Sequence, residues 1–381
     1  MIIFLSFIIT LYGVLIIAFI IGFDRVENFN TPIRTPKTNF SIVIPFRNEA
    51  QSLPVLIKSL KQLEYPLDKF EIIFVDDDSK DSSVESIKKG LDTKFFNKNF
   101  TRPDIKIIKN SRKSGSPKKD AVETAIAQAN FDWILTTDAD CQIPQLWLQT
   151  FDAYIQQYQP KLIAAPVTYN VSNSLLNQFQ LLDILSLQGS TIGGFGIGKP
   201  FMCNGANLCY EKKAFLDIKG FKGNEHIASG DDIFLLEKMT AEYPDKVHFL
   251  KSEKAIIMTQ PEMTLKNLIS QRVRWAAKAT FYKNNFSKLV SVPVFSMNLI
   301  LIILFLASIF GYYSWSYLLT LFVIKFCLDL ILLIKTATFF KQQQVLKHYF
   351  WSSITYPIFI IFIALSSFTS SYSWKGRNYK K

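Results

Sequence analysis

Four long apolar runs lie at the two ends of the chain and leave a more polar middle part between them. The first run, Met1 to Phe23, has no charged side chain. As a helix rising about 1.5 Å per residue it is about 34 Å long, which is enough to cross a bilayer. It lacks a basic N-terminal region and a small-residue cleavage site, so the pattern favours an uncleaved transmembrane anchor over 1–23 rather than a signal peptide.

The other apolar runs cover residues 293–310, 317–334 and 350–368, and Pro357 interrupts the last of them. They predict a C-terminal membrane region over 293–370 with two or three spans, the first two joined as a helical hairpin by the short segment 311–315. Lys325 and Asp329 lie inside the second of these runs, four residues apart, so they share a helix face and are expected to pair. An unpaired charge would be costly there, and a pair that packs the helices is favoured over a transport role.

The middle part, about residues 39–286, alternates short apolar segments with segments of helical periodicity. The expected strands are 40–45, 70–75, 105–108 and 133–137, and the expected helices are 49–63, 117–129 and one opening at Pro144. This order predicts an α/β fold with a mainly parallel sheet covered by helices. Such sheets bind ligands at the carboxyl ends of their strands, so the residues that follow each strand are the first candidates for chemistry.

The composition is apolar for a soluble protein, with 49% hydrophobic and 19% charged residues, and the net charge is +12. Excess positive charge suits anionic partners. Nucleic acid is disfavoured because no helix carries a continuous basic face, whereas basic residues beside apolar runs suit a membrane surface. The 4 cysteines form no C-x-x-C pair and are expected to be reduced, packed thiols.

Basic residues next to the apolar runs predict which side of the membrane the middle part occupies. Arg25, Arg34 and Lys37 follow the first run, and Lys278, Lys283 and Lys288 precede the second, so the middle part is expected on the cytosolic side of the cytoplasmic membrane. If all four runs span, the basic tail 371–381 ends on the outer side. Either one C-terminal run is interfacial or re-entrant, or the positive-inside tendency fails here.

Two acidic clusters follow predicted strands. Asp76, Asp77, Asp78 and Asp81 come after the second strand, and Asp138 and Asp140 come after the fourth. Like charges repel, so a divalent cation or a set of hydrogen-bond donors would stabilise them. Side chains two apart in an extended chain point to the same side, and such hard oxygen ligands suit Mg²⁺ or Mn²⁺ with phosphates completing the shell. Each cluster alone is equally compatible with turn or cap aspartates.

Together these features resemble the family 2 glycosyltransferases, with a GT-A nucleotide-sugar domain. Four blocks in the expected order carry the resemblance over residues 39–280: Ser41-Ile-Val-Ile-Pro45 with Arg47-Asn48-Glu49; Val75-Asp-Asp-Asp-Ser-Lys-Asp81; Thr137-Asp-Ala-Asp140; and Gly230-Asp231-Asp232 with the Q-x-x-R-W pattern Gln271-Arg-Val-Arg-Trp275. The combination is specific, whereas any single block is not.

The resemblance implies how the donor is bound. Asp77 would contact the base of the donor nucleotide near Pro45, with Asn48 and Glu49 in the same donor-binding block. Asp138 would lie by the ribose or diphosphate, and Asp140 would bind the divalent metal. The basic patch Arg112-Lys113 with Lys118-Lys119 resembles the phosphate-side lysine region of the family, although a solvated charged turn is equally possible.

The resemblance also implies the catalytic and acceptor residues. Asp232 would be the general base, and Gln271 and Trp275 would line the diphosphate and acceptor side. Arg274 would contact the donor diphosphate, where a guanidinium suits phosphate oxygens. The implied reaction is direct displacement with inversion at the anomeric carbon.

This chain departs from the family pattern at two places. Asp78 stands where the family commonly has glycine, which leaves the conformation of that turn open. The family pattern T-E-D reads Gly230-Asp231-Asp232 here, so Asp231 is the alternative base.

Three further segments carry weaker expectations. Gly193 to Gly198 is glycine-rich without a phosphate-loop lysine and is expected to be flexible. Residues 175–187 are expected to form a helix, packed in the core or lying at the membrane interface. Residues 265–279 are expected to form an amphipathic helix along the membrane surface. His226 precedes the acidic pair and is a minor candidate for the site.

The leading functional hypothesis is a glycosyltransferase that moves one sugar from a nucleotide-sugar, with UDP as the default nucleotide, to a membrane lipid or lipid-linked acceptor. The enzymatic alternative is a processive polysaccharide synthase. The non-enzymatic alternative is a membrane scaffold subunit, which the intact acidic clusters and Q-x-x-R-W disfavour. Neither the sugar nor the oligomeric state follows from the residues.

Overall fold

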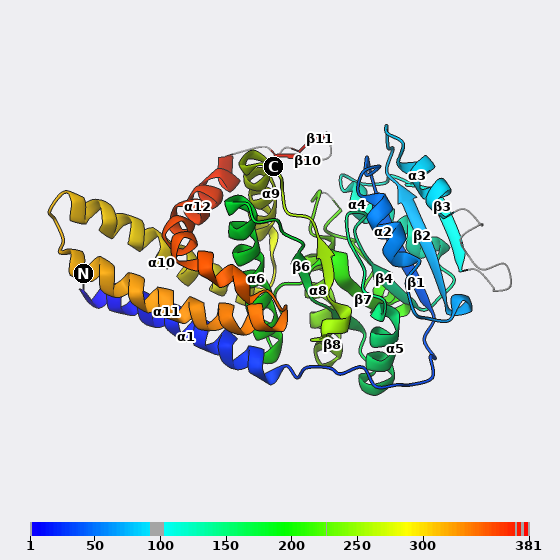
Figure 1. Ribbon diagram of the computed structural model, residues 1–381, viewed down its shortest axis with the longest axis horizontal. Helices are drawn as coiled ribbons and strands as arrows, with labels where there is room; N and C mark the ends of the chain where they lie inside the picture. Colours follow the sequence, from blue (N-terminus) through cyan, green and yellow to red (C-terminus); the bar gives the residue numbers. More distant parts are fainter. Residues whose placement is uncertain (1, 92–102, 226, 370–371, 375–376, 380–381) are drawn as a thin grey trace. The chain divides into compact units, whose positions relative to one another are not determined.

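The computed structural model of the chain describes residues 2–91, 103–225, 227–369, 372–374 and 377–379. The fold divides into two compact units (Figure 1). The sheet unit consists of Glu27–Asn170 and Met202–Gln260, and the helical unit consists of Met1–Val26, Val171–Phe201 and Pro261–Lys381. The domain range 39–286 stays a prediction. Its segments 171–201 and 261–286 belong to the helical unit in this division of the fold.

The sheet unit is built on a seven-stranded sheet with the order β3-β2-β1-β4-β7-β5-β8. The strands in that order are Asp104–Lys109, Phe70–Asp76, Phe40–Phe46, Trp133–Thr136, Leu208–Glu211, Leu162–Ala164 and Val247–Phe249. Only β7 runs antiparallel to its neighbours among these strands. A small parallel pair, β6 (Val167–Tyr169) and β9 (Ile257–Thr259), lies beside it in the same unit. The predicted mainly parallel sheet is confirmed.

Helices of the sheet unit connect these strands. They are α2 (Leu53–Leu60), α3 (Ser83–Gly90), α4 (Pro117–Gln128), α5 (Trp147–Tyr158), α7 (Lys212–Asp217) and α8 (Asp231–Glu242), with short 3₁₀ turns η1 (Leu67–Lys69), η3 (Gly205–Asn207), η4 (Pro244–Lys246) and η5 (Glu253–Ala255). The helix predicted to open at Pro144 begins at Trp147, because the Pro144 carbonyl first accepts the Trp147 N–H in a turn.

The central strands have apolar residues on both faces, as expected for a parallel sheet covered on both sides. The adjacent residues Ile42 and Val43 of β1, and Ile73 and Phe74 of β2, point to opposite faces and are completely buried. Trp147 of α5 is also completely buried, and its indole N–H donates to the Asn207 side-chain oxygen at 3.0 Å. The indole is thereby packed and its polar atom satisfied, which fixes α5 against the turn that precedes β7.

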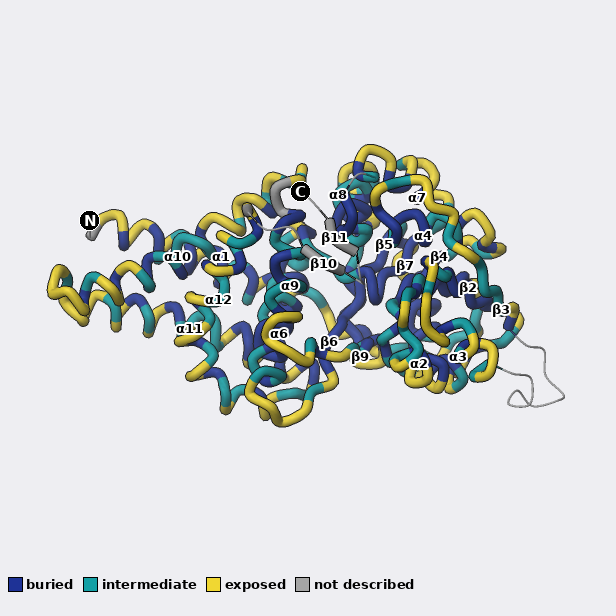
Figure 2. The backbone as a smooth tube through the Cα atoms, turned by 90° about the horizontal axis from the view of Figure 1, so that it is seen from above, coloured by how far each residue is buried: buried dark blue, intermediate teal, exposed yellow. Residues whose placement is uncertain are grey.

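The helical unit contains α1 (Ile2–Arg25), α6 (Leu175–Gly196), α9 (Leu265–Ala277), α10 (Asn285–Ile309), α11 (Trp315–Phe339) and α12 (Tyr349–Thr369), with η6 (Lys278–Phe281) and η7 (Gln343–His348). A hairpin of β10 (Tyr372–Trp374) and β11 (Arg377–Tyr379) follows, and the other residues of the predicted basic tail lie outside the described ranges. Buried and exposed residues alternate along α1 and α11 (Figure 2), which leaves many apolar side chains on the outside.

Four segments of the helical unit are long and apolar enough to cross a membrane: Ile3–Arg25, Asn285–Ile309, Trp315–Phe339 and Gln343–Phe368. The four apolar runs of the sequence therefore fold as helices. Gly311, at a φ of 75°, lies in the short link between α10 and α11, where a left-handed residue suits glycine. The predicted helical hairpin is confirmed.

The crossing of α1 and α6 is made through glycines. A Cβ added at Gly193 would lie 2.5 Å from the Phe19 carbonyl oxygen, and one at Gly196 would lie 1.8 Å from the Gly22 oxygen. The expectation that Gly193 to Gly198 is flexible is wrong, because α6 continues to Gly196. Glycines let two helix backbones approach closely, and this contact keeps the segment helical.

Charged residues tie α1 to α11. Lys325 Nζ lies 2.5 Å from Asp329 Oδ2, which confirms the predicted pair, and the Tyr12 hydroxyl of α1 donates to Asp329 Oδ1. Near the other end of α1, Lys335 lies 2.9 Å from Asp24. The charges inside the apolar helices are therefore matched by partners within the same unit.

Candidate active site

Asp138 and Asp140 follow the carboxyl end of β4 and form the first part of the site. Asp138 Oδ1 lies 2.7 Å from Lys118 Nζ. Asp140 is half-buried, and burial, followed by the negative charge of Asp138, raises the pKa of its carboxyl to about 6. The Gln142 backbone pairs with Met258 just beyond, which fixes the chain direction at this point.

Lys118, in the first turn of α4, connects this strand end to α8. Its Nζ also lies 3.4 Å from Asp231 Oδ2. Burial alone would lower the pKa of Lys118, but the carboxylates of Asp138, Asp231 and Asp232 raise it above its ordinary value. Lys118 therefore stays a cation at the centre of four aspartates, Asp140 among them.

Asp231 and Asp232 open α8 directly after Gly230, whose φ of 86° favours glycine. Asp232 Oδ2 accepts a hydrogen bond from the Gly205 N–H at 3.3 Å. A Cβ added at Gly205 would lie 3.0 Å from Asp231 Oδ2, so a larger residue here would push on the Asp231 carboxylate. The two acids of the fourth sequence block thus lie beside the Asp138 carboxylate, joined to it through Lys118.

The next lysine, Lys119, has different partners from Lys118 and contacts backbone carbonyls instead of aspartates. Its side chain is 1% exposed, and Nζ donates to the carbonyl oxygens of Asn224 at 2.7 Å and Ile227 at 3.0 Å. The same ammonium lies 4.7 Å from the ring centroid of Phe234 in α8. Lys119 is therefore an anchor for the segment that leads into α8, and the alternative of a solvated turn fails for this residue.

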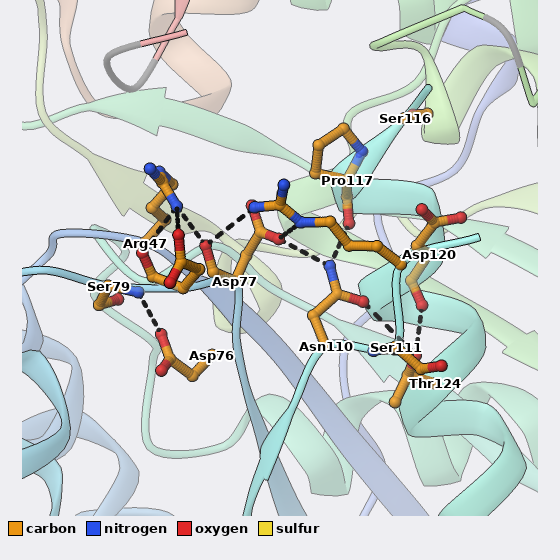
Figure 3. A network of polar contacts seen from close by, with 12 residues as sticks. Arg47, Asp76, Asp77, Ser79, Asn110, Ser111, Ser116, Pro117, Asp120 and Thr124 are labelled. Atoms are coloured by element: carbon orange, nitrogen blue, oxygen red, sulfur yellow. Dashed lines mark hydrogen bonds and ion pairs between the residues drawn. The ribbon is translucent and has the colours of Figure 1, made fainter. Parts of the chain in front are cut away.

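A second part of the site surrounds Asp77 at the end of β2. Asp77 Oδ1 accepts from Asn110 Nδ2 at 2.8 Å and from Arg112 Nε at 2.8 Å (Figure 3). Arg47 donates to the carbonyl oxygens of Asp77 at 2.5 Å and Asp78 at 2.7 Å. Residues that follow β3 hold the buried carboxylate, and Arg47, which follows β1, holds the backbone carbonyl; β1 and β3 are the two neighbours of the strand that carries Asp77.

Asp78 stands where the family commonly has glycine, and its backbone conformation shows how the turn forms without one. Its φ is 63°, in the left-handed region. Aspartate is among the residues that tolerate this conformation best, because its short side chain can bond locally. The turn that commonly carries glycine in the family is therefore formed here with an aspartate.

The segment after β1 holds the loop after β2. The Asn48 side-chain oxygen accepts from the Lys80 N–H at 2.7 Å, and the Glu49 N–H donates to Ser83 Oγ at 2.8 Å. Pro45 is half-buried opposite Val75. In this structure Asn48 and the Glu49 backbone therefore hold the loop that follows β2.

The acidic residues after β4 fit a divalent cation. Burial and the neighbouring charge of Asp138 disfavour the ionised form of Asp140, and a cation beside the two carboxylates would favour it. Within the described ranges no group of three or more His, Cys, Asp or Glu side chains is placed to hold a metal ion. Two carboxylates leave positions for phosphate oxygens and water, which is the usual arrangement for Mg²⁺.

The Q-x-x-R-W residues lie on α9 of the helical unit. Gln271 Nε2 donates to Glu262 Oε1 at 2.9 Å, and the Trp275 ring lies 4.2 Å from the Arg272 guanidinium. Gln271, Arg274 and Trp275 are all half-buried. The four aspartates come together in the sheet unit, whereas this motif belongs to a different compact unit.

Sequence reasoning missed Asn110, and it gave Arg112 and Lys118 only as part of a basic patch, without their partners. Asn110 and Arg112 support Asp77, and Lys118 links the two acidic pairs. The signal was present, since the basic patch after the third strand contains Arg112 and Lys118, but its partners are far away in the sequence. His226 lies outside the described residues.

Comparison with known proteins agrees with this geometry. The model of glycosyl transferase family 2 matches residues 41–216, and the model of glycosyl transferase family group 2 matches residues 133–372, more than half of the chain. A mannosyltransferase from Pyrobaculum calidifontis, solved with GDP-Man and Mn²⁺, has the same fold. Its TM-score is 0.57 at 14% identity, over 96% of this chain and 99% of that one.

Two curated relatives illustrate the range of similar enzymes. Poly-beta-1,6-N-acetyl-D-glucosamine synthase of Staphylococcus aureus is 26% identical over 60% of this chain and 52% of its own length. Undecaprenyl-phosphate 4-deoxy-4-formamido-L-arabinose transferase of Proteus mirabilis is 38% identical over 27% of this chain and 29% of its own. The matches span between 20% and 60% of the length of the curated relatives. On the two family models and the shared GT-A fold, the chain belongs to glycosyl transferase family 2 and is a glycosyltransferase.

Proposed function

We propose that this chain transfers one sugar, with inversion, from a nucleotide-sugar donor to a lipid or lipid-linked acceptor at the cytosolic face of a membrane. The observation that carries the proposal is the group of Asp138, Asp140, Asp231 and Asp232 around Lys118. Sugar transfer needs a base for the acceptor hydroxyl and positive charge at the departing diphosphate. Asp231 and Asp232 could supply the base, and Asp138 and Asp140 could hold a cation for the diphosphate; Lys118 connects the two pairs.

The donor side follows from the first three sequence blocks. Asp77, held by Asn110 and Arg112, would accept a hydrogen bond from the nucleotide base near Pro45. Asp138 would lie by the ribose or diphosphate, with Lys118 beside it. A divalent cation held by Asp140 and the donor phosphates would neutralise charge on the leaving diphosphate.

Asp232 is the better candidate for the general base. A nearby cation favours the ionised form of a carboxylate and makes it a weaker base. Asp231 has the full charge of Lys118 Nζ at 3.4 Å, whereas Asp232 accepts hydrogen bonds from the neutral N–H groups of Gly205 and Ile233, which weaken it as a base less than a cation does. Gln271 and Trp275 would line the acceptor side, and Arg274 would meet the diphosphate charge.

The membrane setting supports a membrane-bound acceptor. Four helices are long and apolar enough to span, and Arg25, Arg34 and Lys37 after α1 favour a cytosolic sheet unit. The relative from Proteus mirabilis is named as an undecaprenyl-phosphate 4-deoxy-4-formamido-L-arabinose transferase. The similarity to that enzyme supports a lipid phosphate as the first acceptor to test.

A donor screen on detergent-purified protein tests the proposal. UDP-, GDP- and dTDP-sugars would be titrated with and without Mn²⁺, with UDP-sugars as the default and GDP-sugars included because of the mannosyltransferase fold. We expect one donor class to bind in a metal-dependent way. Asp140→Ala should abolish that binding and lower turnover by about 10³-fold, since a catalytic metal contributes several kcal/mol.

Asp245→Ala, at an exposed position on the turn η4, is the matched control and should bind like the wild type. Metal-dependent binding that survives in Asp140→Ala would remove Asp140 as the ligand. Absence of binding by every donor, in protein shown to be folded, would argue against the proposed reaction.

A processive synthase is the second candidate, and the similarity to the Staphylococcus aureus polysaccharide synthase over 60% of this chain favours it. Product length decides between the two. A single added sugar on the acceptor supports the proposal, and a ladder of longer products supports the synthase.

A further inference from the structure

Arg272 contacts two of the three Q-x-x-R-W residues, although it is not one of the three. Its side chain donates a hydrogen bond to Gln271 Oε1, and its guanidinium lies 4.2 Å from the Trp275 ring centroid. Its Nε lies 2.7 Å from Asp183 Oδ2 on α6. Arg272 and Asp183 are each only 5% exposed, so this ion pair is screened little by water.

A second connection joins the same two parts of the helical unit. Gln180, three residues before Asp183 on α6, exchanges hydrogen bonds of 2.9 Å with both backbone groups of Glu262. The Glu262 side chain in turn accepts from Gln271 Nε2. The amide of Gln271 is therefore held on its nitrogen by Glu262 and on its oxygen by Arg272.

The Asp183 contact fixes the rotation of α9 about its axis. With about 3.6 residues per turn, side chains two apart point to nearly opposite sides of a helix. With Arg272 directed at α6, Arg274 is directed away from α6. Trp275, three residues after Arg272, stays on the Arg272 side, where the guanidinium covers its ring.

We propose that Arg272, held by Asp183, is a positioning residue that orients Gln271, Arg274 and Trp275 for the transfer reaction. This inference rests on the proposed function, in which those three residues line the diphosphate and the acceptor. Arg272 itself touches no reacting atom. It acts by making one rotation of α9, and one rotamer of Gln271, strongly preferred.

The experiment compares Arg272→Met, Arg272→Lys, Asp183→Asn and the exchanged pair Arg272→Asp with Asp183→Arg. Lys266→Ala is the matched control, since Lys266 lies exposed on the same helix. Three quantities are measured on each full-length protein in detergent: the turnover number for sugar transfer, the affinity for the free donor nucleotide, and amide hydrogen exchange of residues 265–277.

We expect Arg272→Met and Asp183→Asn to speed exchange in α9 and to lower turnover by about 10- to 100-fold, as a displacement of about 1 Å in catalytic groups does. Nucleotide affinity should fall much less than turnover, because Asp77, which would hold the base, belongs to the other unit and only Arg274 of the three oriented residues would reach the diphosphate. Arg272→Lys and the exchanged pair should recover part of the turnover, and Lys266→Ala should match the wild type.

Wild-type turnover in Arg272→Met would overturn the inference, and so would faster exchange in α9 without a loss of turnover. An equal loss of nucleotide affinity and turnover, with no recovery in Arg272→Lys or the exchanged pair, would show a general structural role instead. Failure of the proposed function would appear earlier and separately, as wild-type protein that transfers no sugar from any donor.

Discussion

One acidic cluster of the sheet unit and two ion pairs of the helical unit use charged side chains in opposite ways. In the sheet unit, Asp138, Asp140, Asp231 and Asp232 gather around Lys118, so negative charge is in excess at one point. In the helical unit, Lys325 is paired with Asp329 and Arg272 with Asp183, so each charge meets its opposite.

This difference distinguishes charged residues that stabilise the fold from charged residues that could bind a ligand. A balanced buried pair is satisfied by the protein itself and calls for no ligand. Gathered carboxylates repel one another, and the single positive charge of Lys118 cannot balance all of them; burial, and after it the charge of Asp138, raises the pKa of Asp140. In the proposed function, an excess of one sign of charge, rather than the number of charged residues, distinguishes the ligand site from the packed pairs.

The largest expected effect tests whether the excess charge at α8 is catalytic. Asp232→Asn keeps the size of the side chain but removes the base, so turnover should fall by about 10³-fold while donor binding stays within about threefold. Steady-state kinetics and nucleotide titration measure the two quantities. Asp231→Asn is the paired variant, and the assignment of the base moves to Asp231 if that variant shows the larger loss of turnover.

The next effect tests whether the balanced charges are structural. Lys325→Met leaves the Asp329 charge without its partner, and it should lower the free energy of unfolding by about 3 kcal/mol. Thermal unfolding in detergent measures the change. Lys325→Met combined with Asp329→Leu should recover most of the loss, and a double variant as unstable as the single one would contradict this interpretation.

The smallest effect concerns helix packing without any charge. Gly193→Ala would place a Cβ 2.5 Å from the Phe19 oxygen, so we expect a loss of about 2 kcal/mol from overpacking. Gly13→Ala is the control on α1, because its Cβ would lie at an ordinary 3.6 Å from Leu328 Cδ1. Equal unfolding temperatures for the two variants would show that the crossing has room to adjust.

Much of the sheet unit could be predicted because its signals are local. The apolar strands of residues 40–45 and 70–75 and the acids Asp77, Asp138 and Asp140 are adjacent in sequence to the strands that position them. The pair Lys325 and Asp329 could be predicted for the same reason, since four residues make one helical turn.

The residues that were missed depend on partners far along the chain. Lys119 is buried because its ammonium reaches the carbonyls of Asn224 and Ile227, about a hundred residues later. The sequence around Gly193 predicts a flexible segment, because the close contact of Gly193 with Phe19 and Gly22 of α1 is not visible in the local pattern. A local pattern cannot distinguish a glycine that loosens a loop from one that admits a neighbouring helix.

The glycine crossing also has a consequence for the order of assembly during synthesis. The ribosome completes α1 long before α6, because Gly22 and Gly193 are separated by most of the sheet unit. At about 5–20 residues per second, α1 waits roughly 10–30 s for the surface that packs on its glycine face. Membrane insertion of the first helix and closure of the bundle are therefore separate events, and the strands β1 to β4 are all translated between them.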